Sequence, residues 1–286
     1  MTMKKILILG SSGQIGAYLT EYLRKKGHDV REFDIVNGVH QDMRDIPNPE
    51  LHRQIMTADF VYVLAFDVGG SRYLKKYQHT FEFVNNNSRM MVNVFGLLQK
   101  YNKRFVFASS QMSNMSYSPY GVLKRVGELY TQTLKGLTVK FWNVYGIEKD
   151  MEKAHVITDF IRRGFEETKF EMLTDGTEER QFLYAEDCCE GLETVMECYD
   201  DFKPTDPLHI TSFNSTTINQ VAEIIQGQFN KIGRTDVEII SGLARDSVQM
   251  DKRNEADNYI TGWWLPKTPI HEGIAKVFEE MKSDWI

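Results

Sequence analysis

The sequence contains few cysteines and no long apolar segment. Its three cysteines, Cys188, Cys189 and Cys198, lack the spacing with histidines that a zinc site requires, so we predict no metal site. No segment approaches the roughly 18 consecutive apolar residues of a membrane-spanning helix, and the apolar run at 6–9 is too short for a signal peptide. We therefore expect a cytoplasmic protein that does not associate with membranes.

Basic residues are also in the minority, because 34 lysines and arginines stand against 40 aspartates and glutamates and give a formal net charge of -6. This acidic balance disfavours nucleic acid as a partner. Hydrophobic residues make up 42% and charged residues 26% of the chain, and these ordinary values exclude a disordered or fibrous protein. The 286 residues contain no internal repeat and suffice for one large α/β domain or two unequal lobes.

The first 110 residues alternate short apolar runs with longer amphipathic stretches. This pattern is typical of βαβ units that build a parallel sheet. It predicts strands at 5–9, 29–33, 60–65 and 104–108 and helices at 14–26, 50–56 and about 80–101. The predicted fold is therefore an α/β Rossmann fold with a doubly wound parallel sheet.

The pattern changes after Gly146. A helix at 118–134 and a strand at 137–142 still belong to the first part, and the later predictions are a strand at 170–173 and helices at 154–166, 186–199, 217–231 and 270–282. We assign residues 1–146 and about 184–200 to a dinucleotide-binding domain. Residues 147–183 and about 201–286 should form a smaller, interleaved C-terminal lobe that binds the substrate.

A glycine-rich turn follows the first predicted strand. The segment Gly10-Ser11-Ser12-Gly13-Gln14-Ile15-Gly16 has the spacing G-x-x-G-x-x-G and opens a helix. Gly10 permits a tight turn, Gly13 lets the backbone approach a pyrophosphate, and Gly16 allows the helix to pack closely on the strand. The helix N-terminus then faces the phosphates. This context predicts a dinucleotide site rather than a simple strand-to-helix turn.

Asp34 ends the second predicted strand, about twenty residues beyond the glycines. A carboxylate there can accept both hydroxyls of the adenine ribose and would repel a 2′-phosphate, which favours NAD over NADP. The nearby Arg31 keeps NADP as the alternative. Asp42 and Met43 follow at a distance suited to the adenine edge, unless Asp42 is only a solvated loop acid.

Tyr120 and Lys124 stand four residues apart, which places a phenol and an ammonium on one face of a helix. The lysine can hold the nicotinamide ribose hydroxyls, and its charge should lower the pKa of the tyrosine from about 10 toward the working pH. The tyrosine can then take a proton from a sugar hydroxyl while a hydride leaves the same carbon for the cofactor. Without the glycine turn upstream, a surface helix pair would be the simpler interpretation.

Two serines, Ser109 and Ser110, follow the predicted strand at 104–108. They stand at the carboxyl edge where doubly wound sheets bind their ligands. A hydroxyl there can share the proton that is removed, and we assign this role to Ser110. The alternative is a polar residue that only caps the strand.

Together these features resemble the extended short-chain dehydrogenase/reductase family of NAD-dependent nucleotide-sugar epimerases and dehydratases. The resemblance covers nearly the whole chain. It includes Leu64-Ala65-Phe66, Asn87, Phe141-Trp142-Asn143-Val144-Tyr145-Gly146, Arg180-Gln181-Phe182-Leu183-Tyr184-Ala185-Glu186-Asp187 and Gly262-Trp263-Trp264-Leu265-Pro266. It implies that the cofactor is NAD and that the substrate is a GDP- or UDP-linked sugar.

The residues and the resemblance together give a set of candidate site residues. Ser110, Tyr120 and Lys124 would be catalytic. The resemblance implies that Asn143 reaches the substrate and that Arg180 approaches the nucleotide diphosphate. Further candidates for substrate binding are Gln111, Met112 and Lys153, the last of which is otherwise a surface lysine. The candidate cofactor contacts are Gly10, Ser12, Gly13, Gln14, Ile15, Gly16, Asp34, Ile35, Asp42, Met43, Leu64, Ala65, Phe66, Asn87, Tyr120 and Lys124.

Within this family the two residues after the catalytic hydroxyl indicate the chemistry. The 4,6-dehydratases carry an Asp-Glu pair there, because loss of water needs an added acid and base, whereas this chain has Gln111-Met112. The segment 170–176 and Lys153 resemble GDP-mannose 3,5-epimerases, but Met112 stands where those enzymes place a cysteine. What remains is oxidation or reduction at one carbon, which the family implies is C4.

The predicted enzyme is therefore a 4-dehydrogenase or a 4-epimerase, although the ten residues from Ser110 to Tyr120 are fewer than in typical 4-epimerases. The chain is also similar to bacterial capsule-pathway enzymes, which implies a GDP-heptose or GDP-hexose as substrate. The alternatives are a 4-ketoreductase, a 4,6-dehydratase and a protein that senses NAD without turnover. Family members often pair through two helices, so we expect a homodimer formed by the helices at 80–101 and 118–134.

Overall fold

A six-stranded parallel sheet forms the centre of the protein, seen in a computed structural model that describes residues 2–249, 255–283 and 285. Its strands are β1 Lys5–Leu9, β2 Asp29–Phe33, β3 Phe60–Val63, β4 Phe105–Ser110, β5 Leu137–Phe141 and β9 Leu208–Ile210. They lie in the order β2-β1-β3-β4-β5-β9, and every neighbouring pair is parallel. The prediction of a doubly wound α/β sheet is confirmed.

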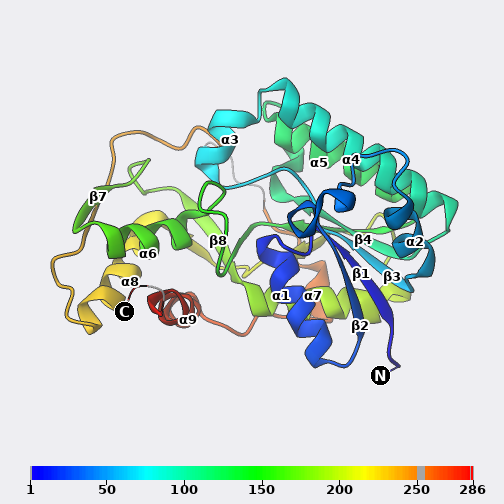
Figure 1. Ribbon diagram of the computed structural model, residues 1–286. Coiled ribbons are helices and arrows are strands. Elements are labelled where there is room, and N and C mark those ends of the chain that lie inside the picture. Colours follow the sequence, from blue (N-terminus) through cyan, green and yellow to red (C-terminus); the bar gives the residue numbers. More distant parts are fainter. Residues whose placement is uncertain (1, 250–254, 284, 286) are drawn as a thin grey trace.

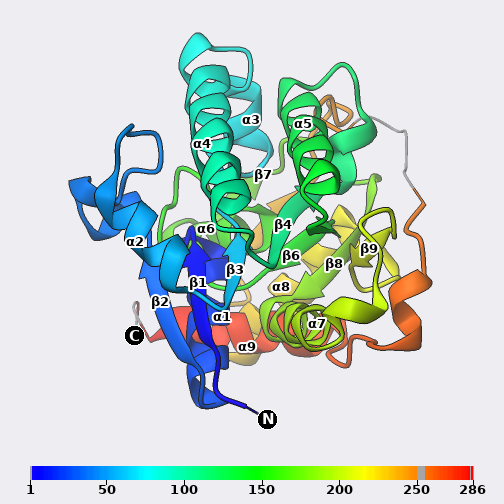
Figure 2. The same ribbon diagram turned by 90° about the vertical axis from the view of Figure 1, so that its right-hand side faces the viewer.

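Helices cover both faces of this sheet (Figure 1 and Figure 2). One face carries α1 Gln14–Lys25 and α7 Ala185–Glu197, and the other carries α2 Pro49–Thr57, α4 Phe81–Lys100 and α5 Pro119–Thr133. Successive strand residues point to opposite faces, so Ile6 and Ile8 pack toward α1 and α7. Leu7 and Leu9 pack toward α2 and α4, and all four side chains are fully buried.

A smaller C-terminal lobe stands beside the large sheet, at the left of Figure 1. Its core includes Phe160, Phe170, Phe229 and Phe278, which are buried apart from the core of the large sheet. The lobe consists of one three-stranded sheet with β6 Asn143–Tyr145, β8 Glu179–Tyr184 and β10 Ser215–Thr217, a parallel pair with β7 Lys169–Glu171 and β11 Glu238–Ile240, and the helices α6 Val156–Glu166, α8 Ile218–Lys231 and α9 Ile270–Lys282.

Several features differ from the predictions, among them the strands β6, β8, β10 and β11, which were not predicted. We expected residues 201–286 to lie in the lobe, but β9 pairs with β5 at the edge of the large sheet, and Ile260 and Trp264 pack into that sheet's core. A short helix, α3 Ser71–Tyr77, follows β3 and was not predicted. None of the helices in the described ranges is long and apolar enough to cross a lipid bilayer.

Candidate active site

A cleft of about 480 Å³ lies at the carboxyl edge of the large sheet, within the usual size of a ligand site. The neighbouring strands β1, β3 and β4 all end at this edge, so the loops after them meet. We call this space the cofactor cleft. Its lining includes Gly10, Ser12, Gly13, Gln14, Ile15, Gly16, Asp34, Ile35, Asp42, Met43, Leu64, Ala65, Phe66, Ser110, Tyr120, Lys124 and Lys153.

The glycine turn forms one wall of the cofactor cleft. A Cβ atom on Gly10 would lie 2.6 Å from the backbone nitrogen of Ala65, and one on Gly16 would lie 2.1 Å from the carbonyl oxygen of Gly10. Gly10 also has a φ of +88°, which side chains disfavour. These clashes explain why the turn requires glycine. Because glycine has no side chain, β1, the turn and α1 can pack as closely as a pyrophosphate cradle needs.

Asp34 lies just after β2, with its carboxylate at the cofactor cleft. One carboxylate oxygen accepts a hydrogen bond from the backbone nitrogen of Ser12, and the other accepts one from Val36, both at 3.0 Å. Each oxygen keeps a further lone pair for a ribose hydroxyl. Arg31 bonds to Thr57 at 2.6 Å and does not line the cleft, so these residues fit NAD better than NADP.

Asp42 forms an ion pair with Arg44 at the same end of the cleft. The Arg44 Nε lies 2.8 Å from one carboxylate oxygen and its Nη2 lies 2.7 Å from the other. These hydrogen bonds lower the pKa of Asp42. Asp42 is therefore a paired residue of the cleft wall and not merely a solvated loop acid, and Met43 lines the cleft beside it.

Tyr120 and Lys124 both belong to α5 and are almost fully buried where this helix borders the cleft. The Lys124 ammonium donates a hydrogen bond to the carbonyl oxygen of Ala108 at 2.6 Å and lies 3.8 Å from the centroid of the Phe66 ring. Its distance to the centroid of the Tyr120 ring is 5.8 Å. Phe66 meets the Tyr120 ring edge to face at 5.7 Å, so the ring of Phe66 contacts both members of the pair.

The two pKa values differ from the expectation that Lys124 makes Tyr120 more acidic. Burial raises the pKa of Tyr120 to about 12, and a hydrogen bond with Ser110 offsets only part of this effect. Burial also lowers the pKa of Lys124 to about 7, although the charge of Glu128 opposes it. Loss of solvent therefore outweighs charge attraction, and an added positive charge beside the phenol would be needed to make it acidic.

Ser110 is the last residue of β4 and lines the cleft. Its hydroxyl oxygen accepts a hydrogen bond from the backbone nitrogen of Met112 at 3.1 Å and caps a short 3-10 helix, Gln111–Asn114. The Gln111 and Met112 side chains are buried and line neither cavity described here, contrary to our expectation of substrate contacts. The capped turn points them into the protein while Ser110 stays at the cleft.

Asn87 also differs from expectation. Its side chain is fully buried in α4 and does not line the cofactor cleft. The side-chain amide of Asn87 forms two hydrogen bonds with the backbone of Asp67. Its Oδ1 accepts from the Asp67 nitrogen at 2.7 Å, and its Nδ2 donates to the Asp67 carbonyl oxygen at 3.2 Å. Asn87 therefore holds the chain just beyond Phe66, and it would affect a cofactor through that turn and not by direct contact.

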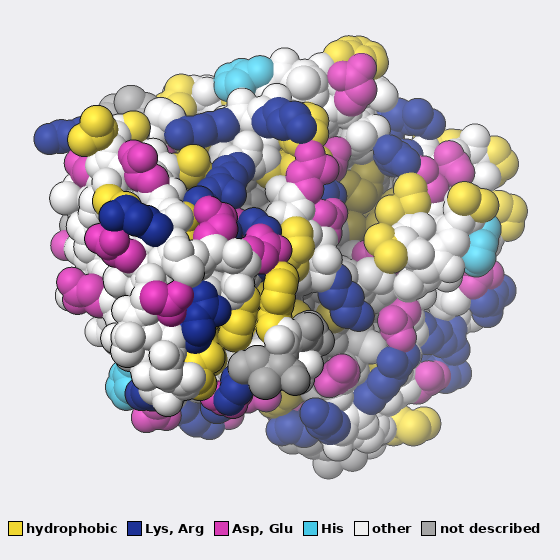
Figure 3. Space-filling model, turned by 60° about the vertical axis from the view of Figure 1, so that its left-hand side comes forward, with side chains coloured by type: hydrophobic (Ala, Val, Ile, Leu, Met, Phe, Trp, Pro, Cys, Tyr) yellow, Lys and Arg dark blue, Asp and Glu magenta, His cyan; other side chains and the backbone are white. Residues whose placement is uncertain are grey.

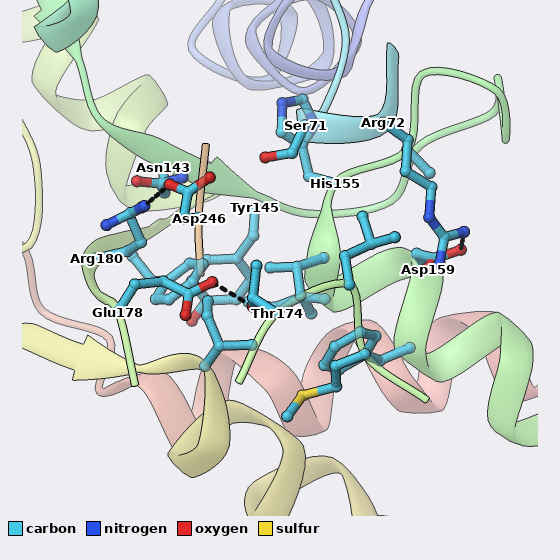
Figure 4. Close-up of a pocket in the computed structure, with 18 of the residues that line it drawn as sticks. Ser71, Arg72, Asn143, Tyr145, His155, Asp159, Thr174, Glu178, Arg180 and Asp246 are labelled. Carbon is cyan, nitrogen blue, oxygen red and sulfur yellow. Dashed lines mark hydrogen bonds and ion pairs between the residues drawn. The ribbon is translucent and has the colours of Figure 1, made fainter. Parts of the chain in front are cut away.

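A second cavity, which we call the lobe pocket, lies between β8 and α6 and shares Val144 and His155 with the cofactor cleft. Asn143 and Arg180 line it, and Arg180 forms an ion pair with Asp246 (Figure 4). On the side of the lobe the surface is hollowed, with basic and acidic side chains around hydrophobic ones (Figure 3). The two adjoining cavities can hold one extended ligand.

Lys153 lies in the cofactor cleft and not in the lobe pocket. Its ammonium is 3.5 Å from a carboxylate oxygen of Asp67. Asp67 also accepts a hydrogen bond from the Tyr73 hydroxyl at 2.5 Å, and burial together with this bond raises the pKa of that phenol. Lys153 is therefore part of a charged cluster that includes α3, which the sequence did not predict.

Sequence reasoning missed His155, which lines both cavities. Its Nδ1 lies 2.6 Å from a carboxylate oxygen of Glu148, and its backbone nitrogen donates to the other oxygen at 2.7 Å. Burial lowers the pKa of His155, but the charge of Glu148 and its hydrogen bond together outweigh burial and leave the pKa above its ordinary value. The two residues lie in the segment between β6 and α6, which has no regular period, so only the fold shows this pair.

Comparison with known proteins places this geometry in a family. A model of the NAD dependent epimerase/dehydratase family matches residues 6–210. The chain belongs to this family. It is 21% identical to UDP-glucuronic acid decarboxylase 1 of Danio rerio (96% of this chain, 72% of the relative) and 27% identical to GDP-mannose 3,5-epimerase 1 of Oryza sativa subsp. indica (77% and 68%).

The fold also matches solved structures of nucleotide-sugar enzymes. The UDP-glucose 4-epimerase of Thermotoga maritima, solved with UDP-glucose, superposes with a TM-score of 0.82 at 19% identity and covers 98% of this chain and 99% of its own. The extended short-chain dehydrogenase/reductase assignment and the cofactor NAD are thereby confirmed. The protein is an NAD-dependent enzyme from a family of nucleotide-sugar epimerases, dehydratases and decarboxylases.

Proposed function

We propose that this enzyme oxidises C4 of a nucleotide-linked sugar, as a 4-dehydrogenase or a 4-epimerase. The observation that carries the proposal is the position of Tyr120, which lines the cofactor cleft together with Ser110 and Lys124. When bound, NAD supplies the hydride acceptor. The adjoining lobe pocket offers room for the nucleotide, with Arg180 as a cation for its diphosphate.

The protein residues manage the proton of this reaction. Tyr120 accepts the proton of the sugar hydroxyl as its phenolate, and Ser110 shares that hydrogen bond while the C–O bond becomes a carbonyl. Lys124 stabilises the phenolate, because its ammonium lies on the same helix face. Burial of both groups disfavours their charged forms, so the positive charge of bound oxidised nicotinamide would be needed to make the phenol more acidic.

The fate of the keto sugar separates the members of this family. Release of the keto sugar gives a 4-dehydrogenase, return of the hydride on the other face gives a 4-epimerase, and the reverse reaction gives a 4-ketoreductase. A 4,6-dehydratase needs an added acid and base, and Gln111 and Met112 supply neither because they lie outside both cavities.

His155 favours a second candidate, epimerisation at a carbon next to the new carbonyl. Among the described residues no hydrogen-bond partner reaches its Nε2, while Glu148 holds Nδ1. Nε2 can take a proton from that carbon, the C–H electron pair then forms a carbon–carbon double bond, and the carbonyl electrons move to oxygen. Water on the other face then gives a proton to the carbon while His155 releases its proton to the solvent, and the carbonyl reforms with inverted configuration at the neighbouring carbon. The buried Met112 neither supports nor opposes this step.

The test incubates the full chain, loaded with NAD, with UDP-glucose, UDP-galactose, GDP-mannose and GDP-glucose in deuterated water. Absorbance of reduced nicotinamide together with a keto sugar indicates a dehydrogenase, and a 4-epimer without net reduction indicates an epimerase. Deuterium on carbon, seen by mass spectrometry, supports the role of His155. Loss of water would contradict our interpretation of Gln111, and no reaction with any of the four sugars would refute oxidation of UDP- and GDP-hexoses.

We further propose that the enzyme is a homodimer. Hydrophobic side chains are exposed along α4 and α5, among them Val84, Val92, Val122 and Leu129. These two helices lie side by side on the same face of the large sheet (Figure 2). Pairing of this surface with the same surface of a second copy would bury these side chains around a two-fold axis.

A further inference from the structure

Two acceptor atoms in the lobe pocket are buried without a partner. They are Oε2 of Glu178 and Oδ1 of Asn143, neither of which has a hydrogen-bond partner among the described residues. The other carboxylate oxygen of Glu178 accepts a hydrogen bond from the Thr174 hydroxyl at 2.6 Å. Unpaired buried acceptors are rare because they are costly, so the pocket calls for a ligand that brings hydrogen-bond donors.

The charge of Glu178 is not neutralised by its neighbours. Arg180, a basic residue that also lines the pocket, forms an ion pair with Asp246. Among the described residues, no lysine or arginine forms an ion pair with Glu178. Figure 4 shows Glu178 and Thr174 on one side of the pocket, close to Arg180 and Asp246. Glu178 therefore presents a charged acceptor edge to the pocket.

We propose that Glu178 makes the lobe pocket selective for guanine, so that the substrate is a GDP-linked sugar; this inference rests on the proposed nucleotide-sugar function. Guanine presents two adjacent donors, N1–H and the N2 amino group, which match the two oxygens of a carboxylate. Uracil presents a single N3–H between two carbonyl oxygens, which the carboxylate repels. Adenine and cytosine present an acceptor nitrogen beside their amino group and are disfavoured for the same reason.

The rest of the pocket suits a purine linked to a diphosphate. Phe160, Met172 and Ile218 contribute buried apolar walls for the faces of a flat ring. Glu178 lies just before β8 and Arg180 is the second residue of this strand, and both side chains line the lobe pocket. The carboxylate can hold the base while the guanidinium reaches toward the phosphates.

The direct test is calorimetric binding of GDP, IDP and UDP to the full chain loaded with NAD. GDP should bind at least roughly tenfold more tightly than UDP, because hydrogen bonds to a charged acceptor are strong and UDP cannot form the pair. IDP lacks only the N2 amino group and should bind roughly tenfold more weakly than GDP. This comparison needs no mutation.

The Glu178→Gln variant tests the residue itself. Its amide places a donor against the guanine donors, so the preference for GDP over UDP should fall at least roughly tenfold. Glu179→Gln is the matched control, because it removes the same charge at the next residue, the first of β8, which does not line the lobe pocket. Thermal melts and NAD binding show whether each variant is folded.

The possible outcomes separate this inference from the proposed function. UDP binding as tightly as GDP would overturn the guanine assignment and leave a nucleotide-sugar enzyme. A GDP preference that survives in Glu178→Gln, or equal weakening of GDP and UDP as expected if Glu178 binds the ribose, would overturn the role of Glu178. Failure of all three nucleotides to bind would overturn the nucleotide-sugar function together with this inference.

Discussion

Replacement of Tyr120 by phenylalanine removes a single oxygen atom from the cofactor cleft. General acid–base catalysis contributes about 10²- to 10⁴-fold to a rate, so turnover of Tyr120→Phe should fall at least about 100-fold. The ring remains in place against Phe66, whose centroid lies 5.7 Å away. The affinity for NAD should therefore change less than about twofold, since the lost oxygen contributes little contact area.

The high pKa of Tyr120 adds a pH dependence to this prediction. In the cofactor-free protein Tyr120 has a pKa of about 12, so the phenolate is a small minority at pH 7, and each unit of pH raises this population about tenfold. A base must be deprotonated to act, so kcat/KM of the wild type should rise above pH 7, at most about tenfold per unit. The residual activity of the variant should not show this rise.

The assay follows keto-sugar or epimer formation and reduced nicotinamide from pH 6 to pH 10, with NAD binding measured separately. Tyr130→Phe is the matched control, because it makes the same change on the same helix at a residue that lines neither cavity. A variant that keeps more than a tenth of wild-type turnover, or that shows the same pH rise, would refute the role of Tyr120 as proton acceptor.

Three further predictions test other parts of the structure. Asp34→Asn removes the charge that opposes a 2′-phosphate, so NADP should gain affinity relative to NAD in fluorescence titrations, and an unchanged ratio would contradict the assignment. Burial lowers the pKa of Lys124 from 10.5 to about 7, so the cost of its buried charge is complete below pH 7 and disappears as the pH rises toward 10.5. Lys124→Met should therefore raise Tm more at pH 6 than at pH 10 in cofactor-free melts, whereas equal shifts would exclude this cost. Leu129→Glu places a charge in the proposed α4–α5 dimer surface and should give a monomer in light scattering, provided that the wild type is a dimer.

The parts of the fold that the sequence predicts are those with local signals. The glycine turn lies between one strand and one helix, so its spacing alone locates it. The helices predicted at 217–231 and 270–282 match α8 and α9 within one residue, since their apolar residues repeat with a helical period. Tyr120 and Lys124 could be placed together for the same reason, because a helix fixes the relative direction of residues four apart.

Elements without such a period were missed or assigned to the wrong place. The strand β9 has three residues and owes its position to pairing with β5, about seventy residues earlier. The helix α3 has seven residues, too few to show a clear repeat. The pair of His155 and Glu148 and the pair of Arg180 and Asp246 depend on loops that meet only in the folded protein.

Family motifs located residues more reliably than they assigned roles. Asn87 and Trp264 belong to segments that resemble family signatures, yet Asn87 bonds to the backbone of a turn and Trp264 packs on Gly191 in α7. Burial decides between these roles, because a side chain without access to a cavity can act on a ligand only through its neighbours. The same criterion directs attention to Glu178, a residue that no motif selected, because its carboxylate has one oxygen buried and unpaired in a cavity. Substrate choice in this enzyme should therefore depend on polar atoms that reach a cavity, such as those of Glu178 and Arg180, more than on signature residues such as Asn87 and Trp264 that lie outside both cavities.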